Sequence, residues 1–137
     1  MTLLIDINVI LDVALERAPF AKDAARLLVS VDRGRAKGYM ATHTVTTLFY
    51  VVAKNRGADA ATRVVSNVLR VLDVVPADRA DLQDAISLGW KDFEDAVQAV
   101  CASKINADLI VTRDLNDFKE SRVPAADPAG ALARLAA

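Results

Sequence analysis

Short runs of apolar residues recur along the chain, and they predict strands that are buried on both faces. The clearest runs lie at 3–5 and 108–111. Further strands are expected at 39–41, at 71–75 before Pro76, and at 122–125. The last of these contains Pro124, which an edge strand tolerates.

Between these runs, apolar residues spaced three or four positions apart predict helices. Pro19 separates the first two helices, and Pro128 stands at the first position of the last one. The threonines at 42–47 form a polar lead into the third helix, which ends at 55–57. The expected helices span 8–16, 20–31, 42–53, 59–70, 78–88, 93–105 and 127–135.

Strands that alternate with helices predict βαβ units and a mostly parallel sheet covered on both faces. We therefore expect a three-layer α/β/α sandwich with a central sheet of four to five strands. The chain has 137 residues, 53% of them hydrophobic, and shows no repeat or linker, so a single domain over 1–137 is expected.

Charge and cysteine content narrow the functional classes. The 17 Lys and Arg residues nearly balance the 18 Asp and Glu residues, so any nucleic-acid contact must use a local basic patch. Cys101 is the only cysteine and lies in an apolar helical stretch, which indicates a buried side chain. With no targeting segment and no apolar run of membrane-spanning length, we expect a cytoplasmic protein without membrane association.

Acidic residues stand where this fold would gather them. Asp6 follows the first strand and Asp114 the fourth, and the carboxyl ends of parallel strands share one edge of the sheet. Asp95 begins a helix whose first turn would face that edge, and Asp117 lies a short turn beyond Asp114. Because such carboxylates repel one another, the pattern predicts a divalent cation, with oxygen ligands favouring Mg²⁺ or Mn²⁺.

Each of these residues also has a structural explanation. Asp6 could serve merely as the cap of the following helix, and Asp95 could interact favourably with the dipole of its own helix. Asp114 and Asp117 could form a turn without binding a metal. Glu94 is a fallback ligand if the helix register differs. A lone histidine such as His43 before a helix is more often a capping or packing residue than a general base.

Three segments together resemble the PIN-domain nucleases, and among them the VapC-type toxins of toxin–antitoxin pairs. The resemblance covers essentially the whole chain. Short Asp-containing patterns are common, but three in this order are fairly specific. The segments are 4–12 (LIDINVILD), 93–98 (FEDAVQ) and 110–118 (IVTRDLNDF).

The resemblance implies an endoribonuclease that hydrolyses RNA phosphodiester bonds with water activated by Mg²⁺ or Mn²⁺. Asp6 and Asp95 are the first expected ligands. One of Asp114 and Asp117 is expected as a further ligand, and the other as an outer residue that holds the loop. Supporting roles are expected for Asn8 and Thr112, which would orient the carboxylates, and for Asp12, which would help to position a water molecule on the metal.

One position departs from the family pattern. The acidic residue usual in the helix after the second strand is replaced by Thr47 or a neighbour, and no acidic residue occurs between Asp32 and Asp59. Some branches of the family carry a polar uncharged residue followed by an aromatic pair, which 47–50 (TLFY) matches. We therefore expect one well-occupied metal, and a second that binds only with substrate phosphate.

Two alternatives remain open. A PIN-like module that binds RNA or protein without cutting is compatible with Thr47, whereas a phosphoacceptor receiver domain needs an aspartate where 74–76 (VVP) stands. The VapC resemblance implies an antitoxin partner, and the apolar surplus is compatible with a homodimer. Basic residues that could follow an RNA backbone are Arg33, Arg35, Lys37, Lys54, Arg56 and Lys91.

Overall fold

Five parallel strands form one sheet in the computed structural model, which describes residues 1–137. Their order is β3-β2-β1-β4-β5, and every neighbouring pair is parallel. The strands are β1 (Thr2–Ile5), β2 (Lys37–Ala41), β3 (Asp73–Val75), β4 (Leu109–Val111) and β5 (Ala125–Ala126). The predicted parallel α/β fold is therefore confirmed.

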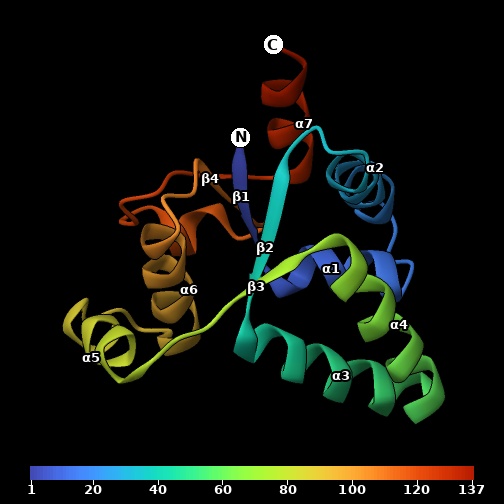
Figure 1. The fold of residues 1–137 in the computed structure, drawn as a ribbon, viewed down its shortest axis with the longest axis horizontal. Coiled ribbons are helices and arrows are strands. Elements are labelled where there is room, and N and C mark those ends of the chain that lie inside the picture. Colours follow the sequence, from blue (N-terminus) through green and yellow to red (C-terminus); the bar gives the residue numbers. More distant parts are fainter.

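Seven α-helices and one short 3₁₀ helix connect the strands (Figure 1). None of the helices is both long and apolar enough to cross a bilayer. The helices are α1 (Ile7–Ala14), α2 (Ala21–Asp32), α3 (Thr42–Arg56), α4 (Ala58–Val71), α5 (Arg79–Ser87), α6 (Phe93–Lys104), η1 (Leu115–Phe118) and α7 (Pro128–Ala136).

Alternation along the strands divides the core between the two faces of the sheet. In β1, Leu3 and Ile5 belong to one apolar cluster and Leu4 to the other, as the two-residue period of a strand requires. The first cluster packs against α1, α2, α3, α4 and α7, and the second against α5 and α6. Cys101 is buried in the second cluster, as predicted.

The main errors of the sequence prediction lie at element boundaries. Val71 ends α4 instead of beginning a strand, because it continues the apolar stripe of Val64 and Val68 against the core. The last strand is Ala125–Ala126 rather than 122–125, and it begins only after Pro124, which has no N–H to donate. The segment 115–118, expected as loop, is the 3₁₀ helix η1.

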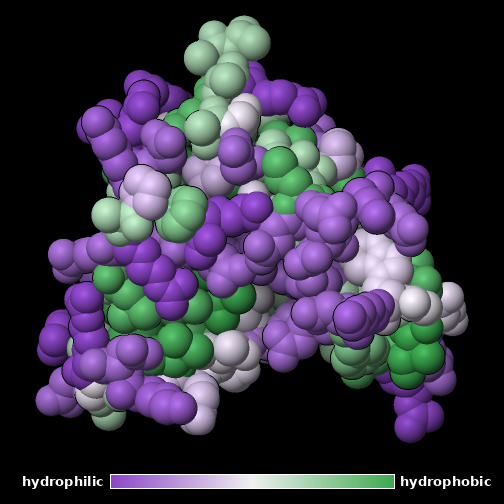
Figure 2. Space-filling view, turned by 180° about the vertical axis from the view of Figure 1, so that it is seen from behind, coloured by the Kyte–Doolittle hydropathy of each residue, from purple (hydrophilic) through white to green (hydrophobic).

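The parallel arrangement brings the carboxyl ends of all strands to one edge of the sheet. In Figure 1 this edge faces downward, where α1 and α3 begin, and both termini lie at the opposite, upper end. The space-filling view from behind shows the lower outline of the molecule notched between two lobes (Figure 2). Of the predicted acidic residues, Asp6 follows β1 and Asp114 follows β4 at this edge, whereas Asp95 lies in α6.

Candidate active site at the acidic edge

Asp6 is held rigidly at the centre of this edge. Its side chain is only 3% exposed and caps α1, where Oδ1 accepts a 2.8 Å hydrogen bond from the backbone N of Ile7. Gln98 Nε2 donates to the same oxygen at 2.8 Å, and Thr112 Oγ1 donates to Oδ2 at 2.8 Å. Three donors from three elements therefore fix one carboxylate.

Asp114 is joined to Asp6 through a short hydrogen-bonded chain. Its backbone N donates to Thr112 Oγ1 at 3.0 Å, and Asn8 Nδ2 donates to its Oδ2 at 2.9 Å. Asn8 lies in the first turn of α1, two residues after the Asp6 cap. The contacts expected for Asn8 and Thr112 are thus present, while their functional roles stay predictions.

Asp95 has the most perturbed acidity of these carboxyls. It lies in the first turn of α6, where its backbone N donates to the capping Asp92 Oδ1 at 3.1 Å. Burial, followed by the negative charges of Asp92, Asp6, Asp117 and Asp114, raises its pKa to about 7. Near neutral pH this side chain is therefore divided between its charged and neutral forms.

Burial also raises the pKa of Asp6, and the charge of Asp114 adds to that effect. Hydrogen bonds from Gln98, Thr112 and the backbone of Ile7 oppose the rise because they favour the charged carboxylate. Two carboxyls on different elements thus have raised pKa values at one edge. This is the electrostatic condition under which a bound cation would relieve repulsion.

Asp117 lies in η1, with an exposed side chain beside Asp95. Both line a cavity of about 810 Å³, together with Lys91 and Lys119. The next residue, Phe118, is buried and meets the Trp90 ring edge-on, with 6.0 Å between ring centroids. The buried Phe118 ring therefore anchors this loop to the body of the protein.

Asp12 does not lie free to contact water. Its side chain is fully buried, and Arg113 donates to both carboxylate oxygens, from Nε at 2.7 Å and from Nη2 at 3.2 Å. Arg17 Nη1 adds a contact of 3.6 Å to Oδ1. The role expected for Asp12, positioning a water molecule on a metal, does not fit these contacts, because the side chain is fully buried and its charge is paired with two arginines.

The helix that follows β2 brings two further predicted residues towards the site. Burial lowers the pKa of His43, and the charges of Glu94 and Asp6 oppose this. His43 is therefore close enough to Asp6 for their charges to interact. Thr47 is half-buried and lies one turn further along the same face of α3. Glu94 is exposed in the first turn of α6.

Three residues of the site were not singled out from the sequence: Gln98, Arg113 and the capping residue Asp92. A polar residue in an apolar helical stretch was the available signal for Gln98, which is 3% exposed. For Asp92, the available signal was its place immediately before the helix, where an aspartate commonly caps the first turn. Nothing in the sequence identified the partner of Arg113, because Asp12 is 101 positions away.

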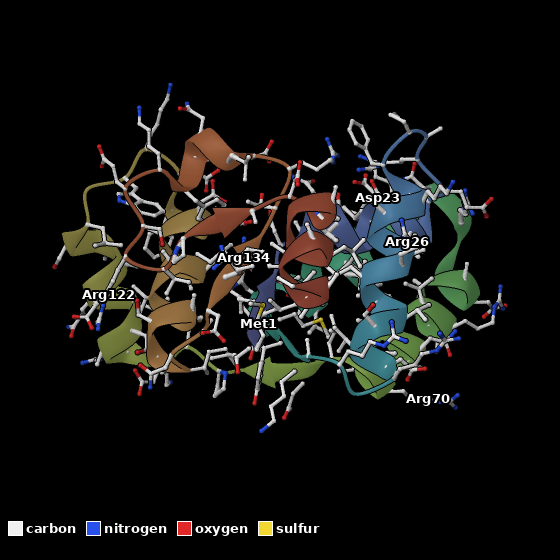
Figure 3. The ribbon with its side chains drawn as sticks, turned by 90° about the horizontal axis from the view of Figure 1, so that it is seen from above. Met1, Asp23, Arg26, Arg70, Arg122 and Arg134 are labelled. Atoms are coloured by element: carbon white, nitrogen blue, oxygen red, sulfur yellow. The ribbon has the colours of Figure 1, made fainter.

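Three of the six basic residues considered for RNA binding lie at the opposite edge of the sheet. Lys37 begins β2 and Arg33 and Arg35 precede it, which puts them at the amino ends of the strands. Arg56 pairs with Glu16 at 3.5 Å. Of that set, Lys91 lines the cavity beside Asp95. Figure 3 looks onto the opposite edge, where the labelled arginines Arg26, Arg70, Arg122 and Arg134 are spread across the view.

The chemistry of the edge suits a hard divalent cation. Four carboxylate charges act on Asp95, and no Lys or Arg charge is among the causes of its shift. Beside Asp6, the Gln98 Oε1 atom is buried without a hydrogen-bond partner. No group of three or more His, Cys, Asp or Glu side chains is yet arranged to hold a metal ion. The donor set therefore fits Mg²⁺ or Mn²⁺, but binding requires the carboxylates to draw closer.

Comparison with known sequences identifies relatives of this chain. A family model described as PIN domain matches residues 2–116. Ribonuclease VapC1 of Aquifex aeolicus is 29% identical over 118 residues, which cover 80% of this chain and 79% of the relative.

Solved structures share the fold at lower sequence identity. VapBC2 from Rickettsia felis, bound to a DNA fragment from its promoter, superposes with a TM-score of 0.74 at 14% identity, covering 93% of this chain and 98% of that one. Mycobacterium tuberculosis VapC20, a sarcin-ricin loop cleaving toxin, has a TM-score of 0.71 at 13% identity, with coverages of 86% and 94%. The resemblance inferred from the three acidic segments is confirmed, and the chain belongs to the PIN-domain family.

Proposed function

We propose that this protein is a Mg²⁺- or Mn²⁺-dependent endoribonuclease that hydrolyses phosphodiester bonds in RNA. The observation that carries the proposal is the gathering of carboxylates at one edge of the sheet, where Asp6, Asp114 and Asp117 lie close enough to Asp95 for their charges to raise its pKa. Strongly perturbed carboxyls in a cleft are a recognised mark of functional sites. The similarity to a protein named ribonuclease VapC1 supports RNA as the substrate.

Asp6, Asp95 and Asp114 are the proposed metal ligands, and Asp117 is the proposed outer residue. When bound, the cation lowers the pKa of water and neutralises charge on the phosphate oxygens. The chain itself holds these carboxylates in position through hydrogen bonds. Asp6 is oriented by three donors, which limits the rotation of its carboxylate. Asn8 restrains Asp114 through the 2.9 Å hydrogen bond.

Asp95 would release a proton when a cation binds. With a pKa of about 7, its carboxyl gives up a proton readily when a positive charge approaches. Asp117, exposed on η1, is placed to hold the loop or to contact solvent in the 810 Å³ cavity. Lys91 and Lys119 line the same cavity and are the proposed contacts for RNA phosphates on either side of the cut.

We further propose that the chain is the toxin of a VapBC-type pair and that an antitoxin protein is its partner. Two of the similar solved structures carry VapBC in their names, which supports this assignment. Self-association is proposed through apolar side chains left exposed on α3 and α5. The most exposed of these are Tyr50 at 65% and Ile86 at 68%.

The test is cleavage of a labelled panel of single-stranded and structured RNAs, with added Mg²⁺ or Mn²⁺ and with EDTA as the control. Asp6→Ala and Asp95→Ala are expected to lower the rate by at least about 100-fold. Asp84→Ala, at an exposed position on α5, is the matched control and is expected to cut normally. If the folded wild type never cuts, the protein is the PIN-like binding module, and Thr47 is the first residue to examine as the cause.

A further inference from the structure

A second, smaller cavity lies next to the acidic edge. Its volume is about 430 Å³, within the range of small-ligand sites, which runs from roughly 300 to 1,000 Å³. The N-terminal ends of α3 and α6, Leu82 of α5 and Ala77 in the segment before α5 form its walls. Phe93 and Glu94, which line it, immediately precede Asp95 in the chain. The cavity is therefore directly continuous in sequence with the proposed metal site.

One wall of this cavity is apolar and includes an aromatic ring. Phe93 is 47% exposed and Leu82 is 39% exposed, with Ala77 and Val97 also lining the wall. An exposed phenylalanine at the N-terminus of a helix contributes little to the core. Aromatic faces of this kind stack on nucleobases with little dependence on sequence.

The other wall offers polar groups that the chain itself does not use. Thr42 Oγ1 donates to Val75 O at 3.3 Å, and Thr46 Oγ1 donates to His43 O at 2.9 Å, so both hydroxyls are engaged. By contrast, the His43 ring and the Glu94 carboxylate make no hydrogen bond or ion pair with any other residue. These two groups are available to a ligand.

We propose that this cavity binds one nucleobase of the RNA, next to the phosphodiester bond that is cut. Phe93 stacks on the base, and Glu94 accepts hydrogen bonds from N–H groups on its Watson–Crick edge. A carboxylate repels phosphate, so the base rather than the backbone enters. Guanine presents two neighbouring N–H groups to a carboxylate and is therefore the preferred base. The RNA identity rests on the proposed function, but base binding does not require cleavage.

The test uses the full chain in EDTA, where no metal-dependent cleavage occurs. Saturation-transfer NMR with guanosine, adenosine, cytidine and uridine measures binding of each base. Guanosine is expected to bind most tightly. Glu94→Gln is expected to reduce the preference for guanosine over uridine by about tenfold, and Phe93→Ala to weaken all four. Leu69→Ala, exposed on α4 outside the cavity, is the matched control and leaves binding unchanged.

Cut-site sequencing of a random RNA pool provides the second readout. Wild type is expected to show guanine enriched at one position beside the cut, and Glu94→Gln to lose that enrichment. If nucleosides bind but no RNA is cut, the proposed function fails and the base site stands. If RNA is cut while no nucleoside binds and Phe93→Ala leaves the cut sites unchanged, the base site is overturned. If the cavity binds a peptide side chain instead of a base, nucleosides will not bind and Phe93→Ala will not change the cut sites, which also overturns the base site.

Discussion

The guanidinium of Arg113 donates two hydrogen bonds, of 2.7 and 3.2 Å, to the buried carboxylate of Asp12. This pair joins α1 to the loop after β4, which carries Asp114. The Phe20 ring lies 4.1 Å from Arg113 Cζ, so the same guanidinium also contacts the α1–α2 connection. One ion pair therefore connects three segments around the acidic edge.

Replacing Arg113 by methionine is expected to destabilise the fold. The substitution leaves the buried Asp12 carboxylate with only the 3.6 Å contact to Arg17. Breaking a buried pair costs about 3–5 kcal/mol, and we expect the lower end because Arg17 remains. Urea unfolding measures the loss. Arg122→Met, at an exposed position without an ion pair, is the control.

The double variant Asp12→Asn/Arg113→Met separates charge burial from packing. Because it removes the uncompensated charge, it is expected to recover part of the stability lost in Arg113→Met. A double variant no more stable than Arg113→Met would show that the ion pair contributes little and that the packing of the arginine stem matters instead.

Gln98→Leu is expected to change acidity more than stability. The substitution removes the 2.8 Å hydrogen bond to Asp6 and also the buried Oε1 atom that has no partner. These effects on stability oppose each other, so the net change is expected to stay within about 1 kcal/mol. The pKa of Asp6 should rise further, because a donor to its charged form is lost. Carboxyl ¹³C NMR across a pH titration measures this, and an unchanged Asp6 titration would contradict it.

The raised pKa of Asp95 predicts that the stability of the fold depends on pH. Its pKa is about 7 in the folded chain, against an ordinary value of 3.8, so the folded state holds a proton between these pH values that the unfolded state has lost. The free energy of unfolding should therefore fall as pH rises from about 4 to about 7. Asp95→Asn removes this effect and should be more stable than wild type at pH 8, by on the order of 1 kcal/mol after allowance for solvent screening.

Thermal unfolding at pH 5 and pH 8, without divalent cations, measures the Asp95 effect. Asp84→Asn also neutralises one carboxylate, at an exposed position on α5. This control should show no such pH-dependent gain in stability. An Asp95→Asn variant with the same advantage at both pH values would mean that its carboxyl does not titrate with a raised pKa.

Thr47→Glu tests whether the departure from the family pattern limits metal binding. Thr47 is half-buried on the face of α3 that also carries His43, which senses the charge of Asp6. An added carboxylate there is expected to raise the affinity for Mn²⁺ by about tenfold. Isothermal titration measures the affinity, with Thr47→Gln as the uncharged control of similar size. Equal affinities in the two variants would show that this position does not reach the metal.

The fold was predictable because the periodicity of apolar residues records which faces are buried. The parallel sheet followed from alternating strands and helices, and the edge that carries Asp6 and Asp114 followed from the sheet. Boundaries failed where two patterns overlap, as at Val71, whose apolar side chain suits either a strand or the helix stripe it continues.

The contacts of the site were less predictable than its carboxylates. Asp12 and Arg113 both lie in segments that the sequence marked, yet their pairing depends on how α1 packs beside the loop after β4. Gln98 reaches Asp6 across 92 positions, and a single polar residue in an apolar helix does not identify its partner. Charges at strand ends are thus visible in sequence, whereas the hydrogen bonds that orient them depend on tertiary structure.

The most direct test of a metal-dependent site is a Mn²⁺ titration followed by electron paramagnetic resonance, on wild type, Asp6→Asn, Asp95→Asn and Asp84→Asn at pH 8. One well-occupied Mn²⁺ is predicted for wild type and Asp84→Asn. Asp6→Asn and Asp95→Asn, shown by circular dichroism to be folded, should lose this bound Mn²⁺. Equal Mn²⁺ binding by all four proteins, or none by the folded wild type, would contradict a metal site formed by Asp6 and Asp95.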